Sequence, residues 1–365
     1  MGEVSGHDAT TPSSIADAIA TAGFVQGTVA PTPAAVTTAA VIARALGTRD
    51  IPYHLRIDED ATTSAAVIFN LDPLDAPPIA LSSADRIAIV AAATVDALTG
   101  GVLEETDRVL LAAAMLAEVP VGTAPAWDAL TEVIGDPYPS AAGLSVPGEM
   151  PGDLNRSLRV LLPTAGDHQS TEAWLTDTAT PDAAVLASML DDAYPPSAVT
   201  AAEQAVEHTP LSLGGHASVE AVAELVIAAG RTDPAGLLAA ATAGALPADA
   251  LDRWRAYGRD VHQAVRAATQ IDVGIMAVPT ADPAVLVGAA DLLRAYRMGT
   301  DHLVVVGETA LVACSIRPVA GDLLSPLMPA TEQPRYGGAH RQWMIPSEVP
   351  EPSRIAAELD LSGAP

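Results

Sequence analysis

Arginine and histidine side chains gather on one predicted helix in the last third of the chain. Arg255, Arg259, His262 and Arg266 are separated by 4, 3 and 4 residues within LDRWRAYGRDVHQAVRAAT, residues 251–269. Residues three and four apart lie on one side of a helix, and guanidinium groups bind phosphate oxygens well. The spacing therefore predicts a basic ridge able to contact a phosphate-rich ligand. A solvated flank beside a buried stripe is the alternative interpretation.

A second group of candidate residues lies in LVACSIRPVAGDLLSPLMPATEQPRYGGAHRQWMIP, residues 311–346. Paired glycines let backbone N–H groups converge on an anion, and the neighbouring arginines and histidine add donors at the rim. A bare turn is the alternative for this loop. The candidate phosphate-binding residues are Ser315, Arg317, Arg335, Gly337, Gly338, His340 and Arg341.

Aromatic residues are scarce, and four of them accompany these arginines. Trp254, Tyr257, Tyr336 and Trp343 are candidates for stacking on nucleobases, but packing in a core or interface is the favoured interpretation for each. The single cysteine, Cys314, excludes an internal disulfide and lies in an apolar run, which predicts a small core residue.

The composition is strongly acidic and lacks lysine. The net charge is −27, and all 18 basic residues are arginines. With small apolar core residues, this indicates a protein that works in molar salt, where carboxylates keep the surface hydrated; an acidic actinobacterial protein is the alternative. Residues 1–252 carry 8 Arg and 33 Asp or Glu, whereas residues 253–365 carry 10 and 12. The last third is therefore best able to approach a polyanion.

Several classes of protein are disfavoured by the sequence. No stretch approaches 18 apolar residues without charge or proline, so no membrane span is expected. The polar N-terminus predicts no signal peptide and a cytoplasmic protein. The common phosphate-loop, dinucleotide, zinc-protease and nucleophile-elbow motifs are absent from the sequence.

Strand and helix patterns alternate in the first half of the chain. Apolar runs predict strands over 24–29, 51–58, 63–72 and 77–83, and alanine-rich runs predict helices over 34–46 and 84–98. This alternation predicts an α/β fold with a doubly wound, mainly parallel sheet. The region 104–136 is expected to be helical. A second α/β unit includes a predicted hairpin with its turn near residues 307–309.

These patterns predict a division of the chain into domains. An α/β domain is expected over 13–165, a helical connector over 166–268, and a smaller α/β domain over 269–346. Residues 347–365, with three prolines by position 352, are expected to form a loosely attached tail.

The strand ending in Ser-Ile-Arg, the G-G-x-H loop and the closing strand resemble the DHHA1 domain of the DHH phosphoesterase superfamily. The order of an α/β domain, a helical connector and a DHHA1-like domain resembles that of the RecJ-like single-strand exonucleases. The general character of the sequence is most similar to the RecJ-like proteins of haloarchaea. This resemblance covers about residues 13–346. It implies a DHH-like first domain and a glycine-rich loop that lines the phosphate end of a nucleic-acid cleft.

The resemblance also implies metal ligands that this chain lacks at the matching positions. An aspartate-rich D-x-D-G motif, which binds manganese or magnesium, is expected after the first strand, where this chain has APTPAAVTT. Asp-His-His is expected after the fourth strand, where Ser82 and Ser83 stand. Asp72 or Asp75 matches at most one further ligand position. Because two-metal hydrolysis needs several anionic ligands, no metal site is expected.

Three functional interpretations remain open from the sequence. The first is a catalytically inactive RecJ-like protein that binds single-stranded nucleic acid, replication partners of the GINS and MCM type, or both, in DNA replication or repair. The second is an active Mn- or Mg-dependent exonuclease or phosphoesterase with rearranged ligands such as Asp72 and Asp75. The third is a structural subunit that binds only other proteins.

Overall fold

The computed structural model describes most of the chain. It covers residues 11–59, 66–71, 78–81, 84–100, 103–123, 138–139, 144–149, 152–162, 164, 167, 169–170, 173–174, 196–207, 211–212, 218–298, 300–316, 324–327, 335–336 and 340–359. No helix in these ranges is both long and apolar enough to cross a bilayer.

The first sheet has the strand order β2-β1-β3-β4. Its strands are β1 (Val25–Val29), β2 (Tyr53–Ile57), β3 (Val67–Leu71) and β4 (Ile79–Leu81). Strand β1 pairs with β2 in parallel, but β1 with β3 and β3 with β4 are antiparallel. The predicted positions of the four strands are therefore confirmed, whereas the prediction of a mainly parallel sheet is wrong.

The physical reason lies in the connections between the strands. A parallel pair needs a long crossover, usually a helix, and only β1 and β2 have one between them in the sequence, α2 (Pro33–Thr48). From β2 to β3 and from β3 to β4 the links are short, so the chain returns in the opposite direction.

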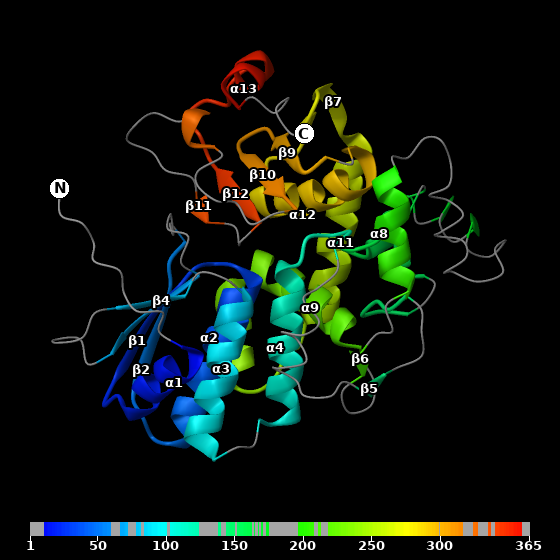
Figure 1. The fold of residues 1–365 in the computed structure, drawn as a ribbon. Coiled ribbons are helices and arrows are strands. Elements are labelled where there is room, and N and C mark those ends of the chain that lie inside the picture. The colour runs from blue at the N-terminus through cyan, green and yellow to red at the C-terminus, as the bar shows by residue number, and fades with distance from the viewer. Residues whose placement is uncertain are drawn as a thin grey trace.

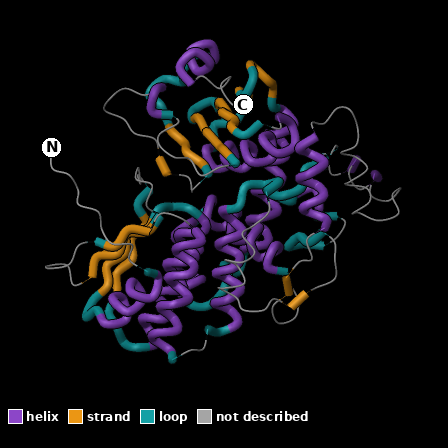
Figure 2. The backbone as a smooth tube through the Cα atoms, viewed as in Figure 1, coloured by secondary structure: helices purple, strands orange, loops and turns teal. Residues whose placement is uncertain are grey.

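Helices cover one face of this sheet. In Figures 1 and 2, α1 (Pro12–Thr21), α2 and α3 (Ala84–Thr99) lie on one side of the strands. Along β1 and β3, every second residue is buried and the residues between are partly exposed. This is the alternation of a sheet with one covered face and one open face.

Helix α2 is the central helix of this half of the molecule. It packs against α3 and against α4 (Glu105–Glu118), α9 (Val219–Thr232) and α10 (Pro234–Thr242). Its side chains are mostly Ala, Thr and Val, and all of those from Pro33 to Ala43 are buried. Gly230 in α9 permits a close approach to α2: a Cβ atom there would lie 2.7 Å from the Cα atom of Pro33.

The second sheet has the order β11-β12-β10-β9-β8-β7. Its strands are β7 (Thr269–Asp272), β8 (Ile275–Ala277), β9 (His302–Val306), β10 (Leu311–Ser315), β11 (Arg335–Tyr336) and β12 (Arg341–Met344). Strands β8 and β9 are parallel across α12 (Pro283–Leu293) and its π-helical continuation, Arg294–Met298. The β9–β10 hairpin is confirmed, because Gly307 N–H donates to Ala310 O at 2.8 Å.

Further elements complete the described chain. They are α11 (Ala250–Ala267), α8 (Pro196–Glu207), β5 (Tyr138–Pro139), β6 (Leu211–Ser212), and 3-10 turns at Leu154–Arg156 and Ser325–Leu327. One buried apolar cluster runs from Ile15 to Cys314 and joins the helices of both halves. The predicted helical region 104–136 is confirmed over α4.

The C-terminal segment is packed rather than loosely attached. Residues Pro352–Leu359 form α13, and Ile355 is 0% exposed in a second cluster with Ile275, Leu311 and Met344. The expectation of a loose tail is therefore wrong for residues 347–359. An isoleucine three residues after the last proline of this segment gives the chain an apolar anchor on the second sheet.

Replacing Ile355 by alanine is expected to lower the free energy of unfolding by about 2–5 kcal/mol, because it leaves a cavity in a closed cluster. Denaturant titration followed by circular dichroism measures the change. Arg354→Ala is the control: its side chain is 56% exposed, so the expected change is within about 0.5 kcal/mol. An unchanged midpoint for Ile355→Ala would show that α13 does not contribute to the fold.

Candidate functional site

A cleft of about 280 Å³ lies between the first strand–helix turn and the second sheet. The β1–α2 turn contributes Pro31 and Thr32, and the turn after β2 contributes Glu59. On the other side lie Arg335 and Trp343 from β11 and β12, with the start of α12. Elements far apart in sequence therefore meet at this cleft, whose volume suits a ligand about the size of a nucleotide.

Helix starts surround this cleft. Helices α2, α10 and α12 each begin with proline after a capping residue, namely Thr32, Asp233 and Asp282. The cap side chains accept backbone N–H groups, for example Asp282 from Ala284 at 2.8 Å and Asp233 from Gly236 at 2.8 Å. Proline in the first turn is preorganised for a helix. The positive ends of the helix dipoles therefore point toward the cleft.

Arg335 and Trp343 form a cation–π pair in the wall of the cleft. They are directly opposite each other in the antiparallel β11–β12 pair, and the guanidinium carbon lies 4.9 Å from the centroid of the indole. This geometry holds a planar cation against an aromatic face. The charged side chains in the lining are balanced, with Arg231 and Arg335 against Glu59 and Asp282.

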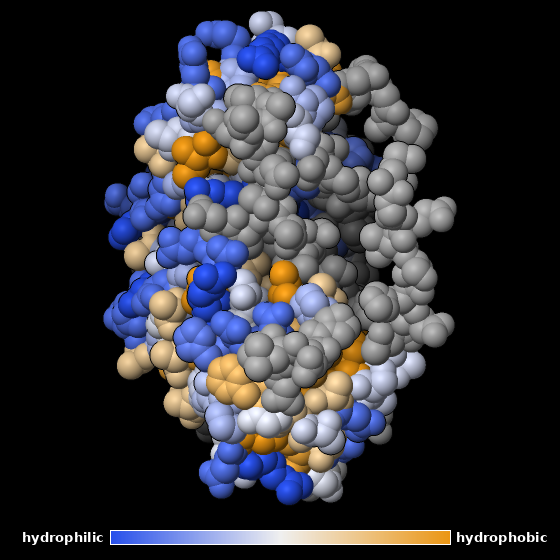
Figure 3. All heavy atoms as spheres, turned by 90° about the vertical axis from the view of Figure 1, so that its left-hand side faces the viewer, coloured by the Kyte–Doolittle hydropathy of each residue, from blue (hydrophilic) through white to orange (hydrophobic). Residues whose placement is uncertain are grey.

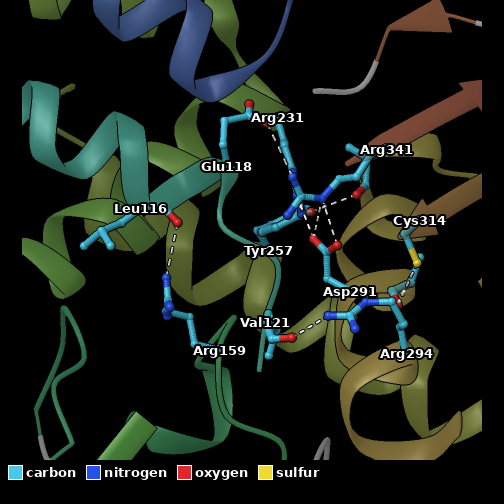
Figure 4. A network of polar contacts seen from close by, with 12 residues as sticks. Leu116, Glu118, Val121, Arg159, Arg231, Tyr257, Asp291, Arg294, Cys314 and Arg341 are labelled. Carbon is cyan, nitrogen blue, oxygen red and sulfur yellow. Dashed lines mark hydrogen bonds and ion pairs between the residues drawn. The ribbon is translucent and has the colours of Figure 1, made fainter. Parts of the chain in front are cut away.

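A buried ion network lies behind the cleft and includes one of its lining residues, Arg231 (Figure 4). Asp291 of α12 accepts from Arg231 at 3.0 Å and from Nε of Arg341 at 2.8 and 2.9 Å. Arg341 also lies 3.7 Å from Glu118 of α4. Arg231 donates to the hydroxyl of Tyr257 at 3.1 Å, and that hydroxyl donates to Ala284 O at 2.8 Å.

The charge states of this network follow from its geometry. Burial alone would raise the pKa of Asp291, but the charges of Arg341 and Arg231 and their hydrogen bonds hold that pKa below its ordinary value. Burial raises the pKa of Tyr257, so its hydroxyl keeps its proton. Asp291 is therefore an anion shared by two guanidinium groups, and it fixes the position of Arg231 in the cleft.

Further polar contacts extend the network to neighbouring elements. Arg294 donates to Val121 O, and Arg159 donates to Leu116 O at 3.2 Å. Both acceptors lie in or just after α4, so the end of that helix is attached to the segment around Arg159 and to the π-helical turn that follows α12. Cys314 is 1% exposed and burial raises its pKa to about 12, which confirms it as a core residue.

The predicted basic ridge on α11 is divided by the fold. Arg255, Arg259 and Arg266 are exposed or half-exposed, and each has a carboxylate partner, Asp153, Asp260 and Asp167 respectively. None of the three lines the cleft.

His262 does not lie on the exposed face with these arginines, so that part of the prediction is wrong. It is 0% exposed, and its Nε2 lies 2.6 Å from Ser157 O. Burial lowers the pKa of His262 to about 4, so the ring is neutral. The segment around Ser157 packs on α11 and covers this side of the helix.

Two of the four aromatic candidates are core residues. Trp254 is 0% exposed and its indole donates to Glu224 at 2.7 Å, while Tyr257 belongs to the buried network. Glu224 also accepts from Ser157 and from the Leu158 N–H, and its burial raises its pKa. Of the predicted stacking residues, Trp343 lies in the cleft.

The structure separates the residues predicted around the G-G-x-H loop. Arg341 is 3% exposed in the ion network, so the prediction that it lies at the rim of a phosphate site is wrong. Ser315 is buried, and its N–H donates to His340 O at 3.0 Å. Arg335 lies in the cleft. The other calls in this region, Arg317, Gly337 and Gly338, lie outside the described residues.

The first strand–helix turn does not fit a two-metal centre. Its described residues Ala30, Pro31 and Thr32 provide one hydroxyl, already used as a helix cap, and no carboxylate. In the described ranges no three His, Cys, Asp or Glu side chains gather as a metal site would require. Asp72, Asp75, Ser82 and Ser83 fall in the gaps of those ranges.

Sequence reasoning missed two residues that define the cleft, Arg231 and Asp282. A signal was present for the second: each of the three helix starts reads as Thr or Asp followed by Pro, which predicts a capped helix N-terminus. No local pattern shows that these three starts converge, because that depends on the packing of α2, α9 and α12.

Comparison with known proteins finds similarity to solved structures. No protein-family model matches the chain, and no curated protein matches it. The structure of RecJ from Thermus thermophilus with Mg²⁺ matches 97% of this chain at 13% identity and a TM-score of 0.47, and its Mn²⁺ complex matches at 14% and 0.47. Exonuclease RecJ bound to manganese matches at 14% and 0.45, over 97% of this chain and 95% of that one.

The chain spans about half the length of the two Thermus structures, 52% and 55%. Its structural neighbours are thus RecJ exonucleases at low sequence identity.

Asp291→Asn is expected to lower the free energy of unfolding by about 3–5 kcal/mol at neutral pH, because two buried guanidinium groups lose their shared anion. Since the folded pKa of Asp291 lies below its unfolded value, its contribution is present above about pH 4 and is lost as pH falls through the folded pKa. Denaturant titrations from neutral to acidic pH should show the difference between the two proteins shrinking below about pH 4.

Asp260→Asn is the control for this experiment, because it removes a carboxylate from an exposed pair and should cost under about 1 kcal/mol. A loss in Asp291→Asn no larger than that of the control would contradict a structural role for the network.

Proposed function

We propose that the protein binds single-stranded nucleic acid in the cleft between the two sheets. The observation that carries this proposal is the Arg335–Trp343 pair, a guanidinium held over an indole at the wall of a nucleotide-sized cleft. Bases stack on aromatic and guanidinium planes without regard to sequence, and guanidinium groups bind phosphate. The pair therefore offers both kinds of contact that a single strand requires.

The rest of the cleft supports an anionic ligand. Arg231 is held in place by Asp291 and Tyr257, so little side-chain entropy is lost when it contacts a ligand. The start of α2 adds partial positive charge, whereas the capping carboxylates of Asp233 and Asp282 offset the dipoles of α10 and α12. Double-stranded nucleic acid would not place a free base against the indole, so a single strand is the better fit.

We further propose that the protein does not hydrolyse its ligand by a two-metal mechanism. This proposal is supported by the residues of the β1–α2 turn, where the resemblance to DHH phosphoesterases implies aspartates and this chain has Ala, Pro and Thr. Association with replication proteins such as GINS is a proposal that rests on the same resemblance, and recovery of replisome subunits with the tagged protein would test it.

Trp343→Ala and Arg335→Ala are each expected to weaken binding of a fluorescein-labelled oligonucleotide of about 12 residues by roughly 5- to 150-fold, the effect of losing about 1–3 kcal/mol of stacking. Fluorescence anisotropy at several KCl concentrations measures the affinity. Trp343→Phe should retain most of it, because a π-face remains.

Arg297→Ala is the matched control, because Arg297 is exposed and does not line the cleft. Equal affinities for the wild type, Trp343→Ala and Arg335→Ala would overturn the assignment of the cleft. A wild-type protein that binds no oligonucleotide at any KCl concentration would favour a role in binding proteins alone.

The wild-type protein is expected to leave a 5′-labelled single strand intact in the presence of Mn²⁺ or Mg²⁺, because the β1–α2 turn lacks carboxylate ligands for two ions. Denaturing gels over time measure the loss of full-length strand. Metal-dependent degradation that Asp72→Ala or Asp75→Ala abolishes would show an active hydrolase with rearranged ligands.

A further inference from the structure

The uncovered side of the first sheet is a polar surface. We call it the outer face and define it by the side chains that alternate with the buried ones along β1 to β4. The first sheet lies on the side of the molecule that faces the viewer in Figure 3, where the coloured side chains are a mixture of hydrophilic and hydrophobic ones. The outer-face residues are Gln26, Thr28, His54, Arg56, Ile68, Asn70 and Ala80.

Strand register arranges these residues in two rows across the sheet. Gln26 of β1 lies opposite His54 of β2 and Asn70 of β3. In the second row, Thr28 lies opposite Arg56 on one side and Ile68 on the other. Cross-strand neighbours on one face have Cβ atoms about 5 Å apart, so each row is a continuous line of side chains.

The outer face, as defined by these seven described residues, holds no acidic side chain in a protein that has 45 of them. In the described part of the chain, the polar side chains of Gln26, Thr28, His54, Arg56 and Asn70 make no hydrogen bond or ion pair with the rest of the protein. By contrast, Arg44 pairs with both Glu104 and Asp107. An arginine without a carboxylate, beside unpaired amide and hydroxyl groups, leaves donors available for a ligand.

The outer face adjoins the cleft. Thr28 and Arg56 are each three residues before a cleft-lining residue, Pro31 and Glu59 respectively. At about 3.3 Å per residue, the second row is roughly 10 Å from the cleft. A chain molecule bound in the cleft would reach this row after one or two further units.

We infer that single-stranded nucleic acid held in the cleft continues over the outer face, with Arg56 at a phosphate and with Thr28, Gln26 and Asn70 as hydrogen-bonding groups. This inference rests on the proposed function of the cleft. The charge that favours the ligand on this face is that of Arg56, and Asp58 and Glu59 follow it on the side of the cleft. The face offers no aromatic platform, so its contacts are to phosphates and base edges.

The test compares a single nucleotide, which fits within the cleft alone, with a strand of about 12 residues, which extends beyond it. For the wild type, we expect tighter binding of the longer strand. Arg56→Glu should weaken binding of the longer strand about tenfold or more, and Arg56→Ala should lower the slope of log affinity against log salt by about one. Neither variant should change binding of the single nucleotide.

Arg297→Glu is the control, since it makes the same change of charge at an exposed arginine outside both surfaces, and thermal unfolding verifies that each variant is folded. Equal binding of the single nucleotide and the longer strand by the wild type would overturn the inference while leaving the cleft assignment intact, whereas absence of binding to either ligand would overturn both. The inference is also overturned if Arg56→Glu leaves strand binding unchanged but alters self-association in sedimentation, because the outer face would then contact a second copy.

Discussion

The buried carboxylate of Asp291 is the interaction on which the arrangement of this molecule depends. It belongs to α12, and it binds guanidinium groups from α9 and β12 that lie far apart in the sequence. Removing a carboxylate and two arginines from water is costly unless all of them are paired. The elements therefore have one arrangement in which these charges are satisfied, and this arrangement fixes how the second sheet lies against the helices around α2.

The same constraint shapes the cleft. Arg231 lies in the last turn of α9, beside Gly230, which lies against the first residue of α2. The position of α2 thus sets the place of Thr32, while Asp291 holds Arg231 near the start of α12. Arginine suits this role better than lysine, because its planar fork binds a carboxylate with several N–H groups and stays charged when buried. Because the chain has no lysine, its buried ion pairs of this kind are made by the planar guanidinium group of arginine.

Much of the local structure was predictable from the sequence, and much of the site was not. Apolar runs and capping residues located the strands of the first sheet, helix α2 and the β9–β10 hairpin, because these depend on nearby residues. The direction of β3 was predicted wrongly. The alternation of strand and helix patterns suggested parallel strands, whereas the connection between β2 and β3 is short and reverses the chain. His262 and Arg341 both looked like surface residues, since helix and strand spacing identifies a shared face but not the segment that covers it. The segment around Ser157 and the carboxylate of Asp291 decide their burial.

An acidic protein that binds nucleic acid repels the phosphates of its ligand, so the surfaces that contact the ligand must offset this repulsion. At low salt the repulsion of −27 net charges reaches across the molecule, whereas at about 1 M salt the Debye length falls to about 3 Å. Screening removes the repulsion, but it also removes long-range attraction to arginines such as Arg56. Binding under such conditions must come from contacts at hydrogen-bond and stacking distance. The Arg335–Trp343 pair and the unpaired amides of the outer face are groups of that kind, and they work best where the rest of the surface is screened.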